Sequence, residues 1–123
     1  MRTNLQNRSV VFFVQDRCLV RIVAEEGGGG CDDRTYTHRC AKQVFETTAH
    51  AIGETPREGD GTSLTKISRQ ENLPFTQVNV ALEFLKERGL VQVRHRHCYP
   101  TTEDVYLDAM VEYYALADSD KMV

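Results

Sequence analysis

The sequence predicts an α+β domain in which a β-hairpin and a glycine-rich loop precede three helices, a second short hairpin and a terminal helix. Three observations lead to this architecture. Residues 8–24 are rich in β-branched and aromatic residues, later apolar residues recur at helical spacing, and proline or glycine separates these segments. A chain of 123 residues can build one hydrophobic core but not two. We expect a single domain over 1–123, with the hairpin and loop over 1–36, a core over 37–101 and the terminal helix over 102–117.

The composition is that of an ordinary globular protein, with 41% apolar and 27% charged residues. No apolar run approaches the roughly 18 residues that span a bilayer. The longest run, residues 10–14, lacks the length and the cleavage pattern of a signal peptide. Four cysteines at irregular spacing (Cys18, Cys31, Cys40 and Cys98) do not form a disulfide pattern and fit a reducing compartment. We therefore expect a cytoplasmic protein without a membrane partner.

Residues 8–24 are predicted to form two strands joined at Gln15-Asp16. A helical wheel scatters the polar residues of this segment on every side, whereas a period of two sorts its apolar residues onto faces. One face holds Cys18, Val20 and Ile22, and the other holds Leu19 and Val23. A helix over the same residues is the alternative. Residues 27–33 include four consecutive glycines and are predicted to form a mobile loop.

The pattern becomes helical from about residue 37 to residue 54. Its apolar face is Ala41, Val44, Phe45, Thr48 and Ile52. Pro56 and the glycines of residues 59–61 end this helix in a turn. Thr62 or Ser63 is then expected to cap a short helix to about Gln70.

Two further elements follow the connection at residues 72–74. A helix over about 75–88 is expected to begin after Pro74 and to stop at Gly89, the residue that suits a left-handed C-terminal cap. Apolar and polar residues alternate in the segments 91–94 and 97–100, which lie on either side of His95-Arg96. This pattern predicts a very short hairpin. The terminal helix then begins near Pro100, with Thr101, Thr102 and Asp104 as capping residues.

The order helix, turn, helix and hairpin resembles the winged helix-turn-helix superfamily of DNA-binding proteins. The segment Leu82-Glu83-Phe84-Leu85-Lys86-Glu87-Arg88-Gly89-Leu90-Val91 is similar to the end of the recognition helix and the first wing strand in MarR- and PadR-like bacterial regulators. The resemblance covers about 40 residues well. It implies a winged helix fold, with a three-helix core and a short β-hairpin wing, and sequence-specific DNA binding in transcriptional control.

The helix over 75–88 would then read DNA with its outer face. At about 100° per residue, the stripe Val78, Ala81, Leu82 and Leu85 faces inward. The opposite face carries Thr76, Gln77, Val80, Glu83, Phe84 and Glu87. In helix-turn-helix proteins the start of this face enters the major groove, where Thr76 and Gln77 can bond to base edges and Asn79 lies at the flank.

Charge is unevenly distributed along the chain, whose net charge is −3. Residues 62–101 carry six basic and three acidic residues, a balance of +3 that favours contact with phosphates. The wing tip, Arg94 to His97, is suited to the minor groove or the backbone, although charge on an edge strand can also serve only to prevent aggregation. The residues expected to contact double-stranded DNA are Ser63, Lys66, Thr76, Gln77, Asn79, Val80, Arg94, His95 and Arg96.

An apolar and acidic outer face would suit a protein partner better than a phosphate backbone. Val80 and Phe84 are neighbours on a helix, and Glu83 and Glu87 share their face. A winged helix that docks an unidentified protein and does not bind DNA is therefore the alternative function.

The terminal helix carries more apolar surface than a monomer needs. Val105, Ala109 and Leu116 form one stripe, while Leu107, Met110, Val111 and Tyr114 cover much of the other side. The resemblance implies a homodimer joined by this helix, with Val105, Met110, Val111 and Tyr114 at the interface. Burial of the helix against the N-terminal hairpin of the same chain is the alternative.

Other kinds of site are not favoured by the sequence. Cys31, His38 and Cys40 lie close together in the sequence, but the sequence contains no Cys-x-x-Cys pair, which is the spacing typical of a zinc site. No nucleophile motif surrounds the cysteines, and no Gly-Lys-Ser/Thr follows the glycine run. We expect no catalytic residue, no metal ligand and no cofactor.

Overall fold

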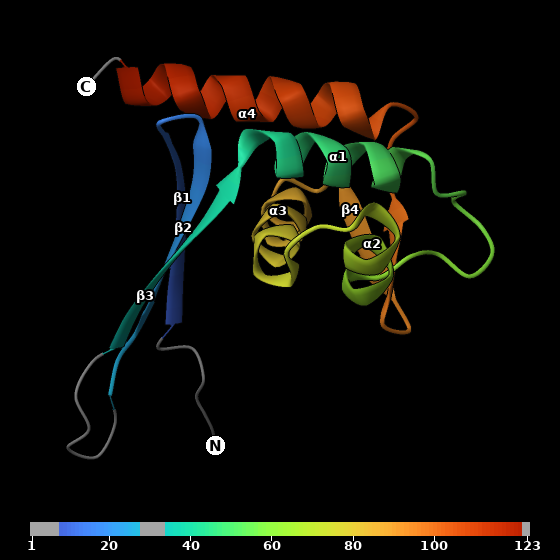
Figure 1. Ribbon diagram of the computed structural model, residues 1–123, viewed down its shortest axis with the longest axis horizontal. Helices are drawn as coiled ribbons and strands as arrows, with labels where there is room; N and C mark the ends of the chain where they lie inside the picture. The colour runs from blue at the N-terminus through green and yellow to red at the C-terminus, as the bar shows by residue number, and fades with distance from the viewer. Residues whose placement is uncertain (1–7, 28–33, 122–123) are drawn as a thin grey trace.

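The computed structural model describes residues 8–27 and 34–121, which form an α+β fold with a three-stranded antiparallel sheet, a separate β-hairpin and four helices (Figure 1). In chain order the elements are β1 (Arg8–Gln15), β2 (Cys18–Glu25), β3 (Arg34–Ala41), α1 (Lys42–Gly53), α2 (Leu64–Glu71), α3 (Phe75–Glu87), β4 (Val91–Arg94), β5 (His97–Pro100) and α4 (Val105–Lys121). No helix among these residues is long and apolar enough to cross a membrane.

The N-terminal hairpin predicted from the sequence is present, and the helical alternative is wrong. Gln15 pairs with Cys18, so the turn is Asp16-Arg17, one residue later than predicted. Both turn residues have positive φ, 53° and 65°. Such a turn matches the twist of the strands that it joins.

The expected helix from residue 37 is wrong at its start, because residues 34–41 form β3. This strand pairs antiparallel with β2, with Leu19 opposite Cys40 and Arg21 opposite His38. Alternate residues therefore point to opposite faces of the sheet, and only Cys40 of the strand is buried. Ala41 is extended, with φ −60° and ψ 146°, and the helix begins at Lys42. The boundary expected between residues 36 and 37 falls inside this strand. Of the loop expected at 27–33, residues 28–33 lie outside the described residues.

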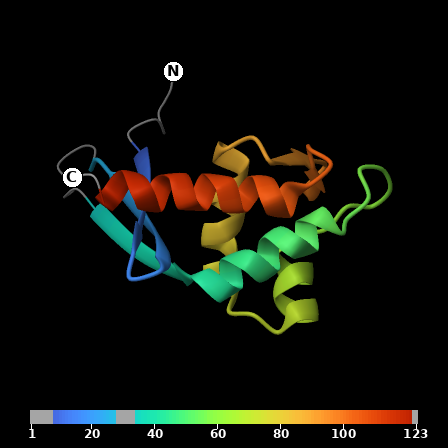
Figure 2. The same ribbon diagram turned by 90° about the horizontal axis from the view of Figure 1, so that it is seen from above.

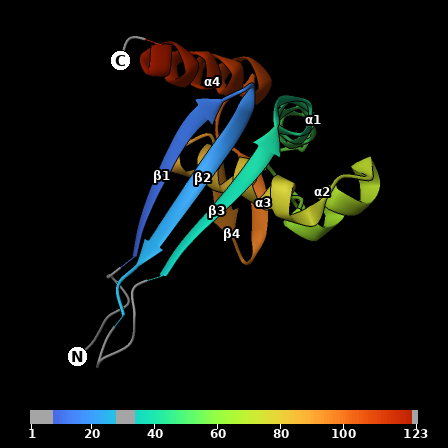
Figure 3. The same ribbon diagram turned by 60° about the vertical axis from the view of Figure 1, so that its left-hand side comes forward.

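One face of the three-stranded sheet packs on the helical part of the fold, and α3 lies behind it in the view of Figure 3. Phe84 of α3 lies between Phe12 of β1 and Phe45 of α1, with ring centroids 5.3 and 5.7 Å apart. Phe45 in turn stacks on Tyr113 of α4 at 5.4 Å. This row of rings joins the sheet, two inner helices and the terminal helix into one core. Figure 2 shows α4 running alongside α1 and above α3.

The helix ends follow local signals in the sequence. Ser63 caps α2 by accepting a hydrogen bond from the Lys66 amide, and the α2 helix ends at Asn72 in the left-handed conformation. Gly89, with φ 76°, follows α3 as predicted. Asp104 accepts from the Leu107 amide at 3.0 Å and so caps α4, which runs beyond its expected end at residue 117.

Candidate functional site

The face of α3 that was predicted to be outward is largely covered by the N-terminal sheet. Val80 and Phe84 are fully buried, together with Val78, Ala81, Leu82 and Leu85. The prediction that Val80 contacts DNA is therefore wrong. The prediction failed because of tertiary packing. The sheet covers one side of α3 and α1 covers the other, so two faces of α3 are apolar.

A narrow arc of α3 stays accessible between these two packed sides. It consists of Phe75, Thr76, Asn79, Glu83, Lys86 and Glu87. At about 100° per residue these six side chains fall within roughly 120° of the helix circumference. Thr76, which was predicted to contact base edges, is exposed, and Asn79, which was predicted to lie at the flank, is half-buried. Both remain on the open arc.

The remaining predicted residue of α3, Gln77, forms a contact within the protein. Its side-chain oxygen accepts a hydrogen bond from the backbone N–H of Ala41 at 2.9 Å. Ala41 precedes α1, whose N-terminus has no side-chain cap of its own. Gln77 therefore connects the start of α3 to the junction of β3 and α1, and its acceptor is not free to face a base.

Arg21 of β2 pairs with Glu83 in the middle of the open arc. Only 5% of Arg21 is exposed, and its second terminal nitrogen donates to Nδ1 of His38 at 3.0 Å. The imidazole nitrogen accepts this bond, because a guanidinium has no acceptor. The pairing neutralises the acidic side chain that stands nearest the centre of the arc.

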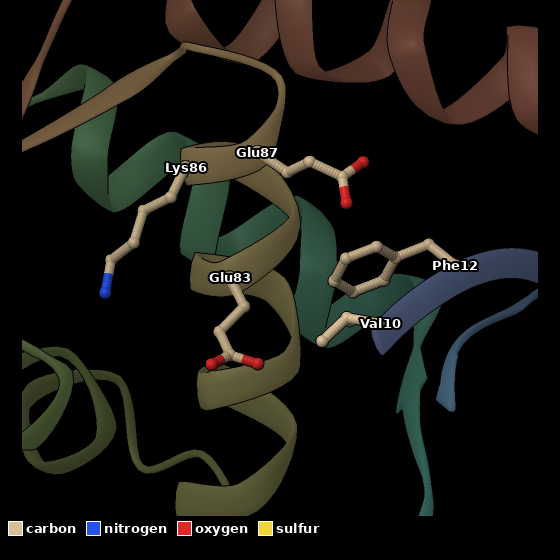
Figure 4. A pocket seen from close by; sticks show the side chains of 5 residues that line it. All are labelled: Val10, Phe12, Glu83, Lys86 and Glu87. Carbon is tan, nitrogen blue, oxygen red and sulfur yellow. The ribbon is translucent and has the colours of Figure 1, made fainter. Parts of the chain in front are cut away.

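A hollow of about 360 Å³ lies where the C-terminal half of α3 meets β1. Val10 and Phe12 form its apolar wall, and Glu83, Lys86 and Glu87 line the other side. Figure 4 shows the Glu87 carboxylate on the side of Phe12 and the Lys86 amine directed away from it. This hollow was not foreseen, because it depends on how the sheet meets the helix.

The β4-β5 hairpin confirms the predicted turn, with His95 and Arg96 both at positive φ (51° and 70°). Arg94 lies over the ring of Tyr99, 3.8 Å from its centroid, and donates to the carbonyl of Arg57 at 2.6 Å. Arg94 is thus positioned by the protein, while His95 and Arg96 are exposed at the tip. Arg57 was not foreseen in this cluster, since it lies far from the hairpin in the sequence.

The hairpin is attached to the segment before α2 by a β-bridge. Thr62 and Cys98 exchange two backbone hydrogen bonds, at 3.0 and 2.7 Å. Gly61 beside this bridge has φ 68°, and a Cβ there would lie 2.8 Å from the Tyr99 ring. The bridge therefore needs glycine at this position, and it holds the hairpin next to α2.

The other two predicted DNA-contacting residues do not join the arc of α3. The hydroxyl of Ser63 is used in the α2 cap. Lys66 lines a separate hollow of about 470 Å³ between α1 and α2, together with His50 and Glu54. The predicted set is thus divided among the α3 arc, the β4-β5 tip and the far side of α2.

The predicted dimerisation set is also divided. Val105 and Met110 are buried in the core, whereas Val111 and Tyr114 are exposed. The prediction that Val105 and Met110 lie at a dimer interface is wrong, because α4 packs on α1 and β1 of its own chain. Leu107 joins Val111 and Tyr114 in one exposed apolar stripe along α4.

The thiols of Cys40 and Cys98 are buried, and burial raises the pKa of both, that of Cys40 to about 12. Such thiols are poor nucleophiles. Within residues 8–27 and 34–121 no three His, Cys, Asp or Glu side chains gather where they could hold a metal ion, and Cys31 lies outside this part of the chain. No protein-family model, curated protein or solved structure matches the chain.

Proposed function

We propose that the chain is a winged helix-turn-helix protein that binds double-stranded DNA with the open arc of α3 and the β4-β5 hairpin as its wing. The order of elements supports this proposal. After α1, the strand-like bridge at Thr62 precedes α2 and α3, and the chain then returns in the hairpin. This bridge joins the segment between α1 and α2 to β5, and so keeps the wing beside the two central helices.

The observation that carries the proposal is the burial of Val80 and Phe84. These two side chains were the apolar part of the reason to expect a protein partner on α3, and the acidic part, Glu83 and Glu87, stays on the open arc. With both in the core, the open arc keeps Thr76 and Asn79, whose hydroxyl and amide can bond to base edges in the major groove. Phe75 is the one exposed apolar residue of the arc.

The charges around the arc also support a duplex partner. Glu83, the acidic residue nearest its centre, is paired with Arg21, and Glu87 lies 3.7 Å from Arg88. Lys86 and the tip residue Arg96 are exposed cations. Exposed cations next to polar base-reading side chains are the usual arrangement of a DNA-binding face, in which phosphate contacts position and base contacts specify.

The test is selection of a preferred duplex from a random pool, followed by fluorescence anisotropy. Asn79→Ala should cost about 1–3 kcal/mol on the selected site and little on a scrambled duplex. Gln43→Ala, an exposed polar truncation on α1, is the matched control and should bind like the parent. Equal losses on both duplexes would remove Asn79 from base reading. Docking of a protein by the α3 arc is the second candidate, and Phe75→Ala would then be the informative variant.

We also propose that the protein acts on DNA as a homodimer, because helix-turn-helix units commonly read two-fold symmetric sites as dimers. The four residues predicted for this contact do not form one surface.

A further inference from the structure

The three-stranded sheet is apolar on both faces, although only one face packs on the helices. Phe12, Leu19 and Cys40 lie on the inner face and belong to the core. Alternate residues of a strand point to opposite faces, so the residues between them form the outer face. The outer positions are Ser9, Val11, Phe13 and Gln15 of β1, Cys18, Val20, Ile22 and Ala24 of β2, and Thr35, Thr37, Arg39 and Ala41 of β3.

This outer face has no cover among the described elements. Figure 3 shows the sheet in front of α3, with the outer face toward the viewer and no described helix or strand before it. Val11 is 56% exposed, and Phe13 and Ile22 are half-buried. An antiparallel sheet with one solvated face normally alternates apolar and polar residues, whereas an unbroken apolar run such as residues 10–14 is typical of a strand covered on both faces. The pattern therefore indicates that the outer face is also covered when the protein works.

The outer face is also almost free of charge. Val20 is fully buried yet lies outside the core, between its cross-strand neighbours Phe13 and Arg39. Arg39 reaches across β2 and donates to Oε1 of Gln15, at 3.4 and 3.5 Å. Among the twelve strand positions of this face, Arg39 is the only charged residue. Such a surface suits contact with a like surface, because no row of like charges opposes the contact.

We propose that this outer face packs on the same face of a second copy, sheet on sheet, about a two-fold axis that runs along the strands. Rotation about such an axis lays β1 of each copy on β3 of the other, and β2 on β2. Phe13 and Arg39 lie in one cross-strand row, so each Arg39 meets the Phe13 ring of the other copy. A cation over an aromatic ring is a favourable contact. The interface uses the same patch of both copies and closes on itself.

The direction of the axis rests on the proposed function, since it must present two α3 helices to one duplex. The sheet, α1 and α2 flank α3. Figure 1 shows α1 and α4 above α3 and the strands extending below it. An axis along the strands therefore keeps the open arcs of both copies on the same side of the dimer.

The spacing of the layers also fits a duplex. Facing sheets lie about 10 Å apart, which puts each sheet about 5 Å from the axis. α3 packs on the inner face of its own sheet, about one layer of 10 Å farther out. The two α3 helices would then be about 30 Å apart, close to the roughly 34 Å between half-sites that are one turn of DNA apart.

Charge favours this face over the exposed stripe of α4 as the contact between copies. The stripe of Leu107, Val111 and Tyr114 is bordered by Asp104, Asp108 and Asp118. Two copies of that stripe would bring like charges together, which opposes their association.

The outer face is small, so association without DNA should be weak. Strands of eight residues are about 27 Å long, and three of them are about 14 Å wide, which gives a footprint of about 400 Å² per copy. A standard interface buries about 800 Å² per partner. We therefore expect the dimer at concentrations near 1 mM, and a duplex with two half-sites should stabilise it.

The test is the mass of the full chain, measured by sedimentation equilibrium without DNA up to about 1 mM. We expect the parent to approach twice the mass of the 14.0 kDa chain. Val11→Lys should stay monomeric with unchanged circular dichroism, because its position is exposed in one copy and its charge would be buried between two. Val111→Lys is the matched control: it places the same charge at a valine that is 57% exposed on α4, and it should leave the dimer intact.

Thr37→Lys repeats the test at an exposed polar position of the same face, where the fold of one copy does not depend on the side chain. This variant should also be monomeric. A parent that stays monomeric at about 1 mM overturns the inference. So does a dimer that both Val11→Lys and Thr37→Lys leave intact, or one that Val111→Lys splits while Val11→Lys does not.

A pair of duplexes separates this contact from DNA binding itself. Val11→Lys should bind a duplex with one half-site like the parent, and should lose the gain in affinity that the parent shows on two half-sites one turn apart. A parent dimer that Val11→Lys splits supports the contact even if no duplex binds. A parent that binds its selected duplex but stays monomeric supports the proposed function and overturns the contact.

Discussion

The guanidinium of Arg21 on β2 pairs with the carboxylate of Glu83 on α3, across 62 residues of sequence. Arg21 is buried, and Glu83 is partly open to solvent. The pair attaches the N-terminal sheet to the helix that carries the open arc. It also removes a negative charge from the surface that we propose for DNA.

Substitution of the two partners of this ion pair should lower the free energy of unfolding by unequal amounts. Glu83→Ala leaves a buried cation without its carboxylate and should lower the free energy of unfolding by about 3 kcal/mol. Arg21→Met keeps the apolar stem and leaves a carboxylate that water can reach. The free energy of unfolding of this variant should therefore fall by only about 1 kcal/mol. Urea denaturation of both variants measures the difference. Equal losses would show that the burial of Arg21 does not govern the pair.

Gln77 should act on stability through its acceptor atom. Gln77→Ala removes the hydrogen bond to the Ala41 amide and should lower the free energy of unfolding by about 1–2 kcal/mol. Gln77→Glu keeps an acceptor at the N-terminal end of α1, where negative charge is favourable, and should stay within about 0.5 kcal/mol of the parent. The comparison is made by thermal and urea unfolding. If both variants lose the same stability, the hydrogen bond is not the cause.

Burial of the Cys40 thiol predicts a loss of stability in alkali. Its pKa is raised from 9.0 to about 12 in the folded protein, because the thiolate would be desolvated. The neutral thiol thus contributes stability that is fully present below pH 9 and is lost as the pH rises toward 12, by up to about 1.4 kcal/mol per pH unit. Urea midpoints between pH 8 and pH 11 should fall less steeply for Cys40→Ala than for the parent. If the urea midpoints of the two proteins fall in parallel as the pH rises, the buried Cys40 thiol is not the origin of the alkaline loss of stability.

The features that could be predicted from sequence depend on neighbouring residues. Ser63 as a cap, Gly89 after α3 and the turn at His95-Arg96 each follow from local backbone chemistry, and the structure contains all three. The N-terminal hairpin was also predicted, within one residue of its turn.

The features that were missed depend on contacts between distant residues. A helical wheel identifies the apolar stripe of α3 at Val78 and Leu82, but it does not reveal that Phe12 of a sheet covers Phe84 on another side. Likewise, the core position of Met110 depends on the packing of α4 on its own chain. Arg21, one cation within an apolar strand, was a signal in the sequence, because such a residue is rarely buried without a partner.

The most direct test of DNA binding is the salt dependence of affinity for the parent protein and two matched variants. Arg96→Gln removes an exposed cation at the β4-β5 tip, and Arg17→Gln removes one from the β1-β2 turn. The measurement is anisotropy of a labelled duplex from about 50 to 200 mM salt. We predict that Arg96→Gln weakens binding alike on selected and scrambled duplexes and flattens the slope of log K against log salt by about one unit, while Arg17→Gln matches the parent. Equal slopes for all three proteins, or a parent that binds no duplex tighter than about 10 μM at low salt, would contradict the account.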